Sequence, residues 1–418
     1  MKMKIVVTWK KLAGLVVLGM GTALLVGWSG FVSISAASGH WTLTRWFLGW
    51  TMKNAVETQA MLITKPQSVD LDDPALILRS AGHYATGCAA CHGAPGVPQS
   101  PVVEEMVPGP PRLEGKIGEW SDEELFWIVK NGIKYSGMPA WPAQDRDDEV
   151  WAQVAFLRAL PGMTRSEYAD LALNGGLATN DLEPGGEAVA SLDGIVEDAL
   201  ADCARCHGRE GQGRGSDMAE AAVPAIAGQP VPYLYATLRA FAEGRRDSGF
   251  MEPPARRYPP DVLEALARYF SAQSAPADPA DSAAPRLIEP TDDPRTAGAR
   301  AVAGAAPPTS WQDEAGVLEG ESDLGYAVVP PAASSGPPST EAGLLELGGR
   351  IAVEGIGTRK IPACQSCHGK AGRKRNSFYP YLQDQPEWYL TQQLKLWQEG
   401  SRGGTPYAHV MDEIARNL

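Results

Sequence analysis

Cys88-Ala89-Ala90-Cys91-His92 is a stretch of this 418-residue chain that recurs twice, as Cys203-Ala204-Arg205-Cys206-His207 and as Cys364-Gln365-Ser366-Cys367-His368. All six cysteines of the chain fall in these three C-x-x-C-H pentapeptides, so none is left over. On a helix, residues at i, i+3 and i+4 share one face, so each copy places two thiols and an imidazole side by side. The pattern therefore predicts three copies of one helical binding site.

Haem c is the ligand that suits such a face, because two thiols bond its vinyl groups while the histidine reaches the iron. Zinc sites, redox dithiols and structural disulfides are the other uses of paired cysteines. Zinc would need four ligands within or between clusters, and a redox dithiol leaves the three histidines unexplained. We expect three covalently bound haem c groups, with His92, His207 and His368 as iron ligands.

The composition is that of an ordinary globular protein. With 44% apolar and 21% charged residues, the chain is not wholly disordered, collagen-like or a multi-span membrane protein. The formal net charge is -13, and no segment has the basic footprint of a nucleic-acid-binding protein. The length allows two or three domains, and nucleic acid is not an expected partner.

The N-terminus supplies a membrane signal. Lysines at positions 2, 4, 10 and 11 precede an apolar stretch from Leu12 to about Ala37, longer than the roughly 20 residues of a membrane span. We interpret residues 1–40 as a retained anchor. The alternative is a cleaved signal peptide, although such cores are usually about 7 to 15 residues long. Either way the haem domains are expected in the periplasm, and the retained anchor makes this a single-pass inner-membrane protein.

Residues 41–72 form a juxtamembrane segment. Within it, Leu43, Trp46, Phe47 and Trp50 repeat at helical spacing, which is typical of a short amphipathic helix at the lipid interface. The alternative is that this stripe packs on the first soluble domain. The sequence favours neither interpretation.

From residue 73 onward a unit recurs: a short helix leading into the haem motif, a loop rich in glycine and proline, then further helices. In the first unit a helix is expected from Pro74 to Tyr84, a capping box at 121–124 opens a second, and Asp145 starts a third. The predicted fold is all-α, with tandem domains over 73–165, 187–273 and 341–418.

A sixth iron ligand is needed if each haem is to carry electrons, and methionine is the one that raises the potential. Met138, Met251 and Met411 lie 46, 44 and 43 residues after the histidines of their own units. We predict these three as axial ligands, with His409 as a rival to Met411. A methionine is by default a core residue, and that interpretation is kept for Met106, Met163 and Met218.

These features resemble class I c-type cytochrome modules, the first showing CAACHG and a Gly-Met-Pro turn around Met138. The second and third modules resemble the two halves of a dihaem cytochrome of the c-four type, because residues recur at an offset of 156. The resemblance implies small helical electron carriers in the periplasm. It also implies haem-propionate contacts for arginine and tyrosine side chains, with plain helix packing as the alternative. The residues concerned are Arg246, Arg402, Tyr233 and Tyr389, and Gln229 pairs with Gln385 at the same offset.

Two features depart from that family pattern. Residues 274–340 are rich in Ala, Pro, Ser and Asp and predict a disordered or extended linker, which argues against a rigid two-fold packing of the second and third modules. An insertion folded onto the second module through Trp311 and Tyr326 is the alternative. The chain also ends seven residues after Met411, so the third module is expected to lack a closing helix.

No catalytic residues are predicted, because no nucleophile triad, carboxylate pair or nucleotide-binding loop accompanies the modules. We expect an electron carrier that takes single electrons from a quinol-oxidising complex or dehydrogenase and delivers them to a terminal oxidase or soluble cytochrome. The alternative is the cytochrome subunit of a membrane-bound alcohol, aldehyde or sugar-acid dehydrogenase.

A basic cluster at residues 370–375 predicts a docking patch for an acidic partner or, equally, a solvated loop.

Overall fold

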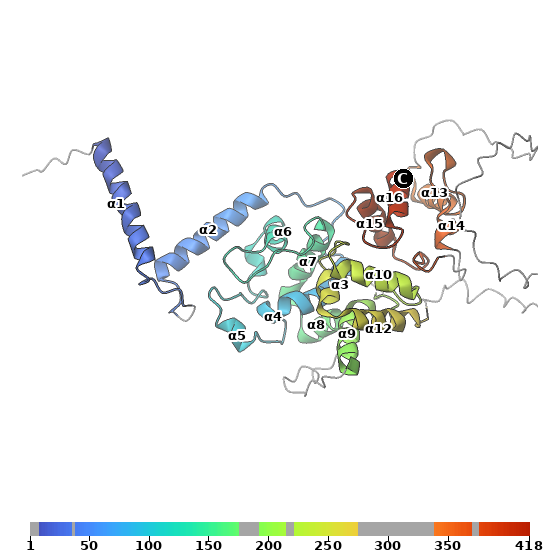
Figure 1. Cartoon of the computed structure of the whole chain (residues 1–418), viewed down its shortest axis with the longest axis horizontal. Helices are drawn as coiled ribbons and strands as arrows, with labels where there is room; N and C mark the ends of the chain where they lie inside the picture. Colours follow the sequence, from blue (N-terminus) through green and yellow to red (C-terminus); the bar gives the residue numbers. More distant parts are fainter. Residues whose placement is uncertain (1–7, 36–37, 175–191, 215–220, 275–337, 370–375) are drawn as a thin grey trace, which may run out of the picture. The chain divides into compact units, whose positions relative to one another are not determined.

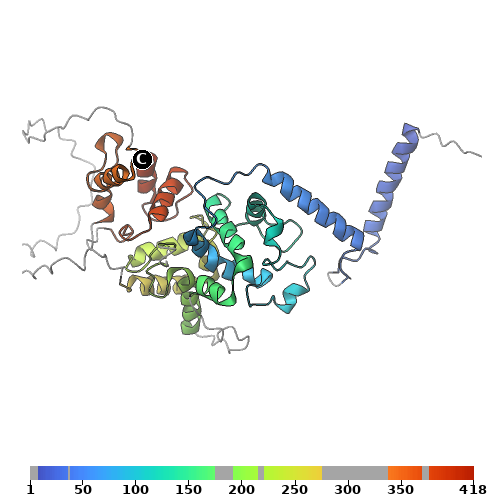
Figure 2. The same cartoon turned by 180° about the vertical axis from the view of Figure 1, so that it is seen from behind.

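The structure is a computed structural model that describes residues 8–35, 38–174, 192–214, 221–274, 338–369 and 376–418. Over these ranges the chain forms helices and only isolated β-bridges, as both faces of the ribbon show (Figures 1 and 2). The all-α prediction is therefore confirmed. The α-helices are α1 Trp9–Trp28, α2 Thr42–Ala60, α3 Pro74–His83, α4 Ala89–His92, α5 Pro101–Glu104, α6 Asp122–Asn131, α7 Asp147–Ala159, α8 Arg165–Ala172, α9 Leu192–His207, α10 Val231–Ala242, α11 Glu252–Arg257, α12 Pro260–Ser271, α13 Glu341–Glu354, α14 Cys364–His368, α15 Glu387–Gln398 and α16 Ala408–Arg416.

The chain divides into two compact units. The first contains residues 1–276 together with 367–418, and the second contains residues 277–366. The described part of the second unit is residues 338–366, which include α13. The predicted linker over 274–340, with Trp311 and Tyr326, lies almost wholly outside the described residues.

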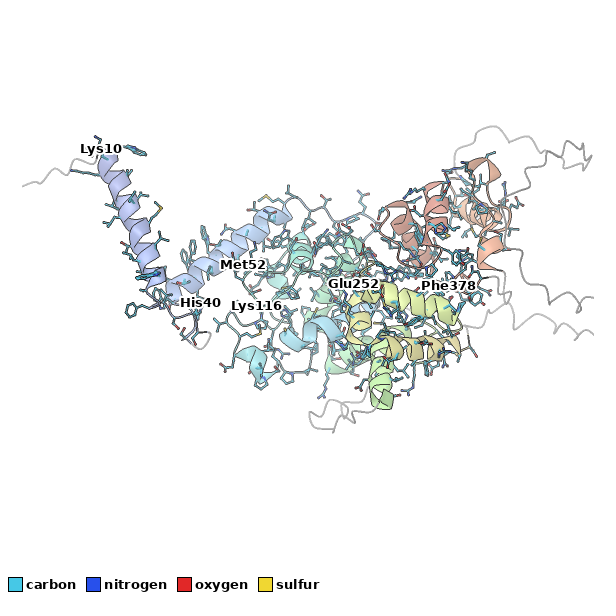
Figure 3. The ribbon with its side chains drawn as sticks, in the orientation of Figure 1. Lys10, His40, Met52, Lys116, Glu252 and Phe378 are labelled. Atoms are coloured by element: carbon cyan, nitrogen blue, oxygen red, sulfur yellow. The ribbon has the colours of Figure 1, made fainter. Side chains whose placement is uncertain are left out.

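Helix α1 is the one candidate membrane span among the described residues. It has 20 residues, none of them buried, and is long and apolar enough to cross a bilayer. Lys10 lies at its N-terminal end, and His40 lies in the segment that joins it to α2 (Figure 3). The apolar run predicted from the sequence therefore forms a helix that ends nine residues earlier, at Trp28.

Helix α2 is exposed at one end and packed at the other. Val56 and Ala60, near its C-terminus, are buried where the helix packs on α6. By contrast, Trp46 is 62% exposed and Trp50 is 54% exposed, and their rings stack with centroids 6.2 Å apart. The aromatic stripe is thus not the surface by which α2 packs on the first module.

The first module has its core between α3, α6 and α7. Phe126 of α6 packs on Trp151 of α7, with ring centroids 4.4 Å apart. The predicted capping box opens α6, because Ser121 and Glu124 exchange side-chain hydrogen bonds with each other's backbone N–H. Helix α7 begins at Asp147, two residues later than predicted, because the backbone of Arg146 is not helical.

The second module is built from α9, α10, α11 and α12. The apolar face of α12 contributes Leu263, Leu266 and Phe270 to a core that includes Leu234 of α10 and Leu200 of α9. The amphipathic pattern of α12 accounts for this packing, since its apolar residues recur every three or four positions. This core positions the second haem motif, which forms the last turn of α9.

The second and third modules are joined by a reciprocal pair of glutamines. The side chain of Gln229 binds the backbone of Tyr381 through two hydrogen bonds of 2.9 Å, and Gln385 Nε2 donates to the carbonyl of Ala225 at 2.8 Å. Gln229 and Gln385 are equivalent positions at the 156-residue offset, and so are Ala225 and Tyr381. The contacts therefore have pseudo-two-fold symmetry. The expectation that the linker prevents such packing is wrong for residues 376–418, because these local hydrogen bonds do not depend on how the modules are connected.

Candidate functional site

Each C-x-x-C-H motif is helical, but the three helices begin differently. In the first module α3 runs into a π-turn, Tyr84–Cys88, and then into α4, which ends at His92. The second motif closes the 16-residue helix α9, and the third forms the short helix α14. In all three the two cysteines and the histidine therefore lie on one helical face, as the spacing predicts.

A glycine in the left-handed region follows each motif. Gly93, Gly208 and Gly369 have φ values of 71°, 77° and 81°. A residue with positive φ directly after a helix ends that helix. Any residue other than glycine would be strained in this conformation. The glycine thus terminates the helix directly after the histidine and turns the chain away from the thiol face.

A backbone carbonyl fixes the ring of each motif histidine. The Nδ1 atoms of His92, His207 and His368 lie 2.8, 2.9 and 2.8 Å from the carbonyl oxygens of Pro111, Pro224 and Pro380. A carbonyl can only accept, so Nδ1 carries the proton and Nε2 keeps its lone pair. Burial also lowers the pKa of all three imidazoles, which favours the neutral form. A neutral ring oriented by a second hydrogen bond is the usual state of a metal-binding histidine.

No disulfide joins the motif cysteines of the first two modules. Burial raises the pKa of Cys88 and of Cys203 to about 12 and raises that of Cys206, so these side chains stay protonated at neutral pH. A reactive dithiol needs a depressed thiol pKa. Within the described ranges no group of three His, Cys, Asp or Glu side chains is placed to hold a metal ion. The sites therefore present two cysteines and a neutral imidazole on one helical face, which are the groups that attach haem c.

The first two predicted methionine ligands lie in similar turns. The backbone N–H of Met138 donates to Ser136 Oγ, and that of Met251 donates to Ser248 Oγ, each at 3.1 Å. Both methionines are half-buried. The methyl group of Met106 lies against Gly137, where an added Cβ would be only 2.5 Å away. Met163 packs on the first core, and Met218 lies outside the described residues.

The third predicted methionine ligand lies within a helix. Met411 is half-buried on α16, whereas His409 is exposed two residues earlier. Two residues on a helix differ by about 200°, so the two side chains project from nearly opposite sides. This arrangement favours Met411 over its rival.

Two buried arginines meet at the junction of the second and third modules. Arg246 Nη2 donates to the hydroxyl of Tyr389 at 3.3 Å, and Arg402 makes the equivalent bond to Tyr233. The arginines also stack alike, Arg246 over Phe241 at 4.5 Å and Arg402 over the equivalent Trp397 at 5.0 Å.

The Arg–Tyr cluster places two positive charges close together in a buried environment. Burial, and then the nearby Arg246, lower the pKa of Arg402 to about 10. Among the described residues neither guanidinium has an acidic partner within ion-pair distance. Buried charges are normally paired, so this cluster fits carboxylates supplied by a ligand, such as haem propionates.

Comparison with known proteins identifies the class. The family described as cytochrome c oxidase, cbb3-type, subunit III matches residues 75–157. Cytochrome c-554(548) of Halomonas halodenitrificans is 31% identical over 80 residues, covering 18% of this chain and 90% of that protein. The chain belongs to the cytochrome c family, and it is accordingly an electron-transfer protein that binds haem c covalently.

Longer relatives extend the similarity. The thiosulfate dehydrogenase electron acceptor of Thiomonas intermedia is 28% identical over 218 residues, covering 52% of this chain and 72% of that protein. Among solved structures, the cytochrome c4 of Acidithiobacillus ferrooxidans is 26% identical and covers 52% of this chain and 91% of that one, with a TM-score of 0.31. The c-type cytochrome modules expected from the sequence are thus confirmed as a class.

Sequence reasoning missed the three proline carbonyls. They follow their histidines by 19, 17 and 12 residues, so no fixed spacing marks them. A proline in the loop after each motif is the signal that was available. The predicted basic cluster at residues 370–375 lies outside the described residues.

Proposed function

We propose that this protein is a membrane-anchored cytochrome with three haem c groups that passes single electrons between a respiratory donor and a terminal oxidase or soluble cytochrome. The observation that carries the proposal is the threefold recurrence of one arrangement: a helical C-x-x-C-H motif, a left-handed glycine and a histidine oriented by a proline carbonyl. When bound, haem c supplies an iron that gains and loses one electron at a time.

The residues that would hold each haem follow from this arrangement. The two cysteines of each motif would form thioether bonds, and the motif histidine would bind iron through Nε2. A methionine would complete each site. The proposed pairs are His92 with Met138, His207 with Met251 and His368 with Met411, and the thioether cysteines are Cys88, Cys91, Cys203, Cys206, Cys364 and Cys367.

The Arg–Tyr cluster supports two neighbouring haems in the second and third modules. Its two guanidiniums come from equivalent positions, Arg246 and Arg402, and each bonds a tyrosine of the other module. Propionates from both haems would neutralise the two arginines. This is the arrangement expected of an electron relay, in which the cofactor carries the redox change and the protein fixes its surroundings.

A reductive titration tests the electron-carrying role. Dithionite added anaerobically to the oxidised protein should be consumed to three electrons per chain, and the reduced protein should not bind carbon monoxide, since all six iron positions are filled. Uptake of fewer than three electrons would contradict the triple-haem proposal. Carbon monoxide binding at one iron would instead indicate an open site and a haem enzyme.

Localisation at the inner membrane rests on α1 and on the aromatic stripe of α2. Trp41, Trp46, Phe47 and Trp50 are all more than half exposed. An exposed row of aromatic side chains next to an apolar span is typical of the membrane–water interface. Carbonate washing of membranes should leave the protein bound. Recovery of the chain in the soluble periplasmic fraction, lacking residues 1–37, would support the signal-peptide alternative.

A dehydrogenase partner is the second candidate, and the relatives suggest its kind. A protein named thiosulfate dehydrogenase electron acceptor matches half of this chain. We infer that the dehydrogenase donor is a periplasmic sulfur-compound dehydrogenase, in place of the alcohol, aldehyde or sugar-acid enzymes. Stopped-flow reduction by such an enzyme with thiosulfate would favour this donor, and reduction only by a quinol-oxidising complex would favour the respiratory one.

A further inference from the structure

A buried carboxylate of the first module is bonded to a loop of the second. Glu149, on α7, is 3% exposed. Its Oε1 accepts from Ser248 Oγ at 2.6 Å and its Oε2 accepts from the backbone N–H of Gly249 at 2.6 Å. Arg146 neutralises the carboxylate at 2.9 Å within the first module. Short hydrogen bonds to an ionised carboxylate are the stronger kind, and Arg146 Nη1 also donates to the carbonyl of Asp247 at 2.9 Å. These contacts together hold the loop against the first module.

The bonded loop is the one that carries Met251. Ser248 has a single hydroxyl proton, which it donates to Glu149, and the same oxygen accepts from the backbone N–H of Met251 at 3.1 Å. A continuous chain of two hydrogen bonds therefore leads from Glu149 to Met251. The orientation of the serine hydroxyl is set by the carboxylate.

The equivalent turn of the first module is built differently. Ser136 Oγ accepts from Met138 N–H at 3.1 Å but donates to the carbonyl of Ile133, within its own loop. The Met138 turn is therefore self-contained, whereas the Met251 turn depends on another module. The hydrogen bond from the methionine N–H to a serine hydroxyl is thus common to both turns. The bond from that serine to a carboxylate of another module is specific to the Met251 turn.

Aromatic side chains also pack where this loop of the second module meets the first module. Phe250 meets Trp141 edge to face, with centroids 5.6 Å apart, and lies 5.3 Å from His83. An added Cβ at Gly249 would overlap the Trp141 indole, so the loop approaches the first module as closely as glycine allows. Trp141 lies three residues after Met138, so the two methionine-bearing loops touch.

We propose that Glu149 is a positioning residue for the second haem site. Through Ser248 it holds the Met251 turn in the conformation that presents the methionine sulfur to the second iron, and it thereby makes the potential of that haem depend on the first module. The inference rests on the proposed role of Met251 as an axial ligand.

Proton NMR of the reduced full-length protein provides the test. Each iron-bound methionine gives a separate, strongly upfield methyl signal, and Met138→Ala and Met251→Ala assign the first two by their loss. In Glu149→Asp the charge is kept but the carboxylate is one methylene shorter, so it cannot hold both Ser248 and Gly249. We expect the Met251 signal to shift or broaden while the Met138 and Met411 signals stay in place. The equilibrium constant for reducing the second haem should fall about tenfold. For one electron, this lowers the reduction potential of that haem by about 59 mV.

Ser248→Ala and Ser136→Ala are the matched pair of controls. Ser248→Ala should reproduce the effect of Glu149→Asp, and the double variant should be no worse than either single one, because both act through one chain of bonds. Ser136→Ala should move only the Met138 signal. An unchanged Met251 signal and potential in Glu149→Asp would overturn the inference, and so would equal shifts of all three signals, which indicate a merely structural role. If Met251→Ala removes no signal from the wild-type spectrum, the ligand assignment itself is wrong and the inference falls with it.

Discussion

His83 should make the stability of the first module depend on pH. Its ring lies between Trp141, at 4.7 Å, and Phe250, at 5.3 Å, and burial lowers its pKa from 6.5 to about 4. Below pH 6.5 the imidazole of the unfolded chain binds a proton, whereas the folded protein binds one only near pH 4. The unfolded state therefore holds more protons across this window, and stability falls as the pH falls.

The magnitude follows from the two pKa values. Each unit of difference corresponds to 1.36 kcal/mol, so linkage gives a loss of about 2 kcal/mol between pH 7.5 and pH 5. Guanidinium unfolding followed by far-ultraviolet circular dichroism measures it. His83→Phe keeps an aromatic ring but cannot titrate, so it should lose about 2 kcal/mol less than the wild type over this range. An identical loss in His83→Phe and the wild type would refute the reasoning.

Three further predictions concern the sites and the module junction. Met411→Ala should remove about a third of the near-infrared sulfur-to-iron band of the oxidised protein and lower one potential, while His409→Ala leaves both unchanged; the reverse result would make His409 the ligand. Gln229→Ala loses two hydrogen bonds to Tyr381 and should destabilise the junction by about 1–3 kcal/mol in thermal unfolding, more than Gln385→Ala, which loses one. Gly93→Ala places a side chain at positive φ, 3.0 Å from Arg112 Nη1, and should lower the free energy of unfolding by about 1–2 kcal/mol. An unchanged melting temperature would show that this position is not strained by a side chain.

Local patterns in the sequence predicted much of the fold. The capping box at Ser121 and Glu124 was found because both partners lie within one helical turn. The C-x-x-C-H face follows in the same way from helical spacing. Such features depend only on residues three or four positions apart, and the sequence displays them directly.

Contacts between distant segments could not be predicted in the same way. The carbonyl of Pro111 reaches His92 from 19 residues away, and Glu149 reaches Ser248 from 99 residues away. A carbonyl carries no sequence signal, and one glutamate at the start of a helix looks like any other. These partners are defined by packing, which the sequence pattern does not contain.

The pairing of the second and third modules is an intermediate case. The recurrence of Gln229 as Gln385 was visible, but the long segment at 274–340 argued against a rigid pair. A long linker adds only slowly to the entropic cost of bringing two modules together, so it does not prevent specific contacts. The repeated glutamines were the better evidence, because they supply those contacts on both sides.

The central claim is that three haems are bound covalently, and the intact mass of the denatured chain tests it most directly. After acid–acetone extraction the polypeptide should keep its colour and its mass should equal that of the chain plus three haems. A Cys203→Ala/Cys206→Ala variant should lose the mass of one haem and keep the other two. A mass equal to the chain alone, or to the chain with one or two haems when all six cysteines are intact, would contradict the account.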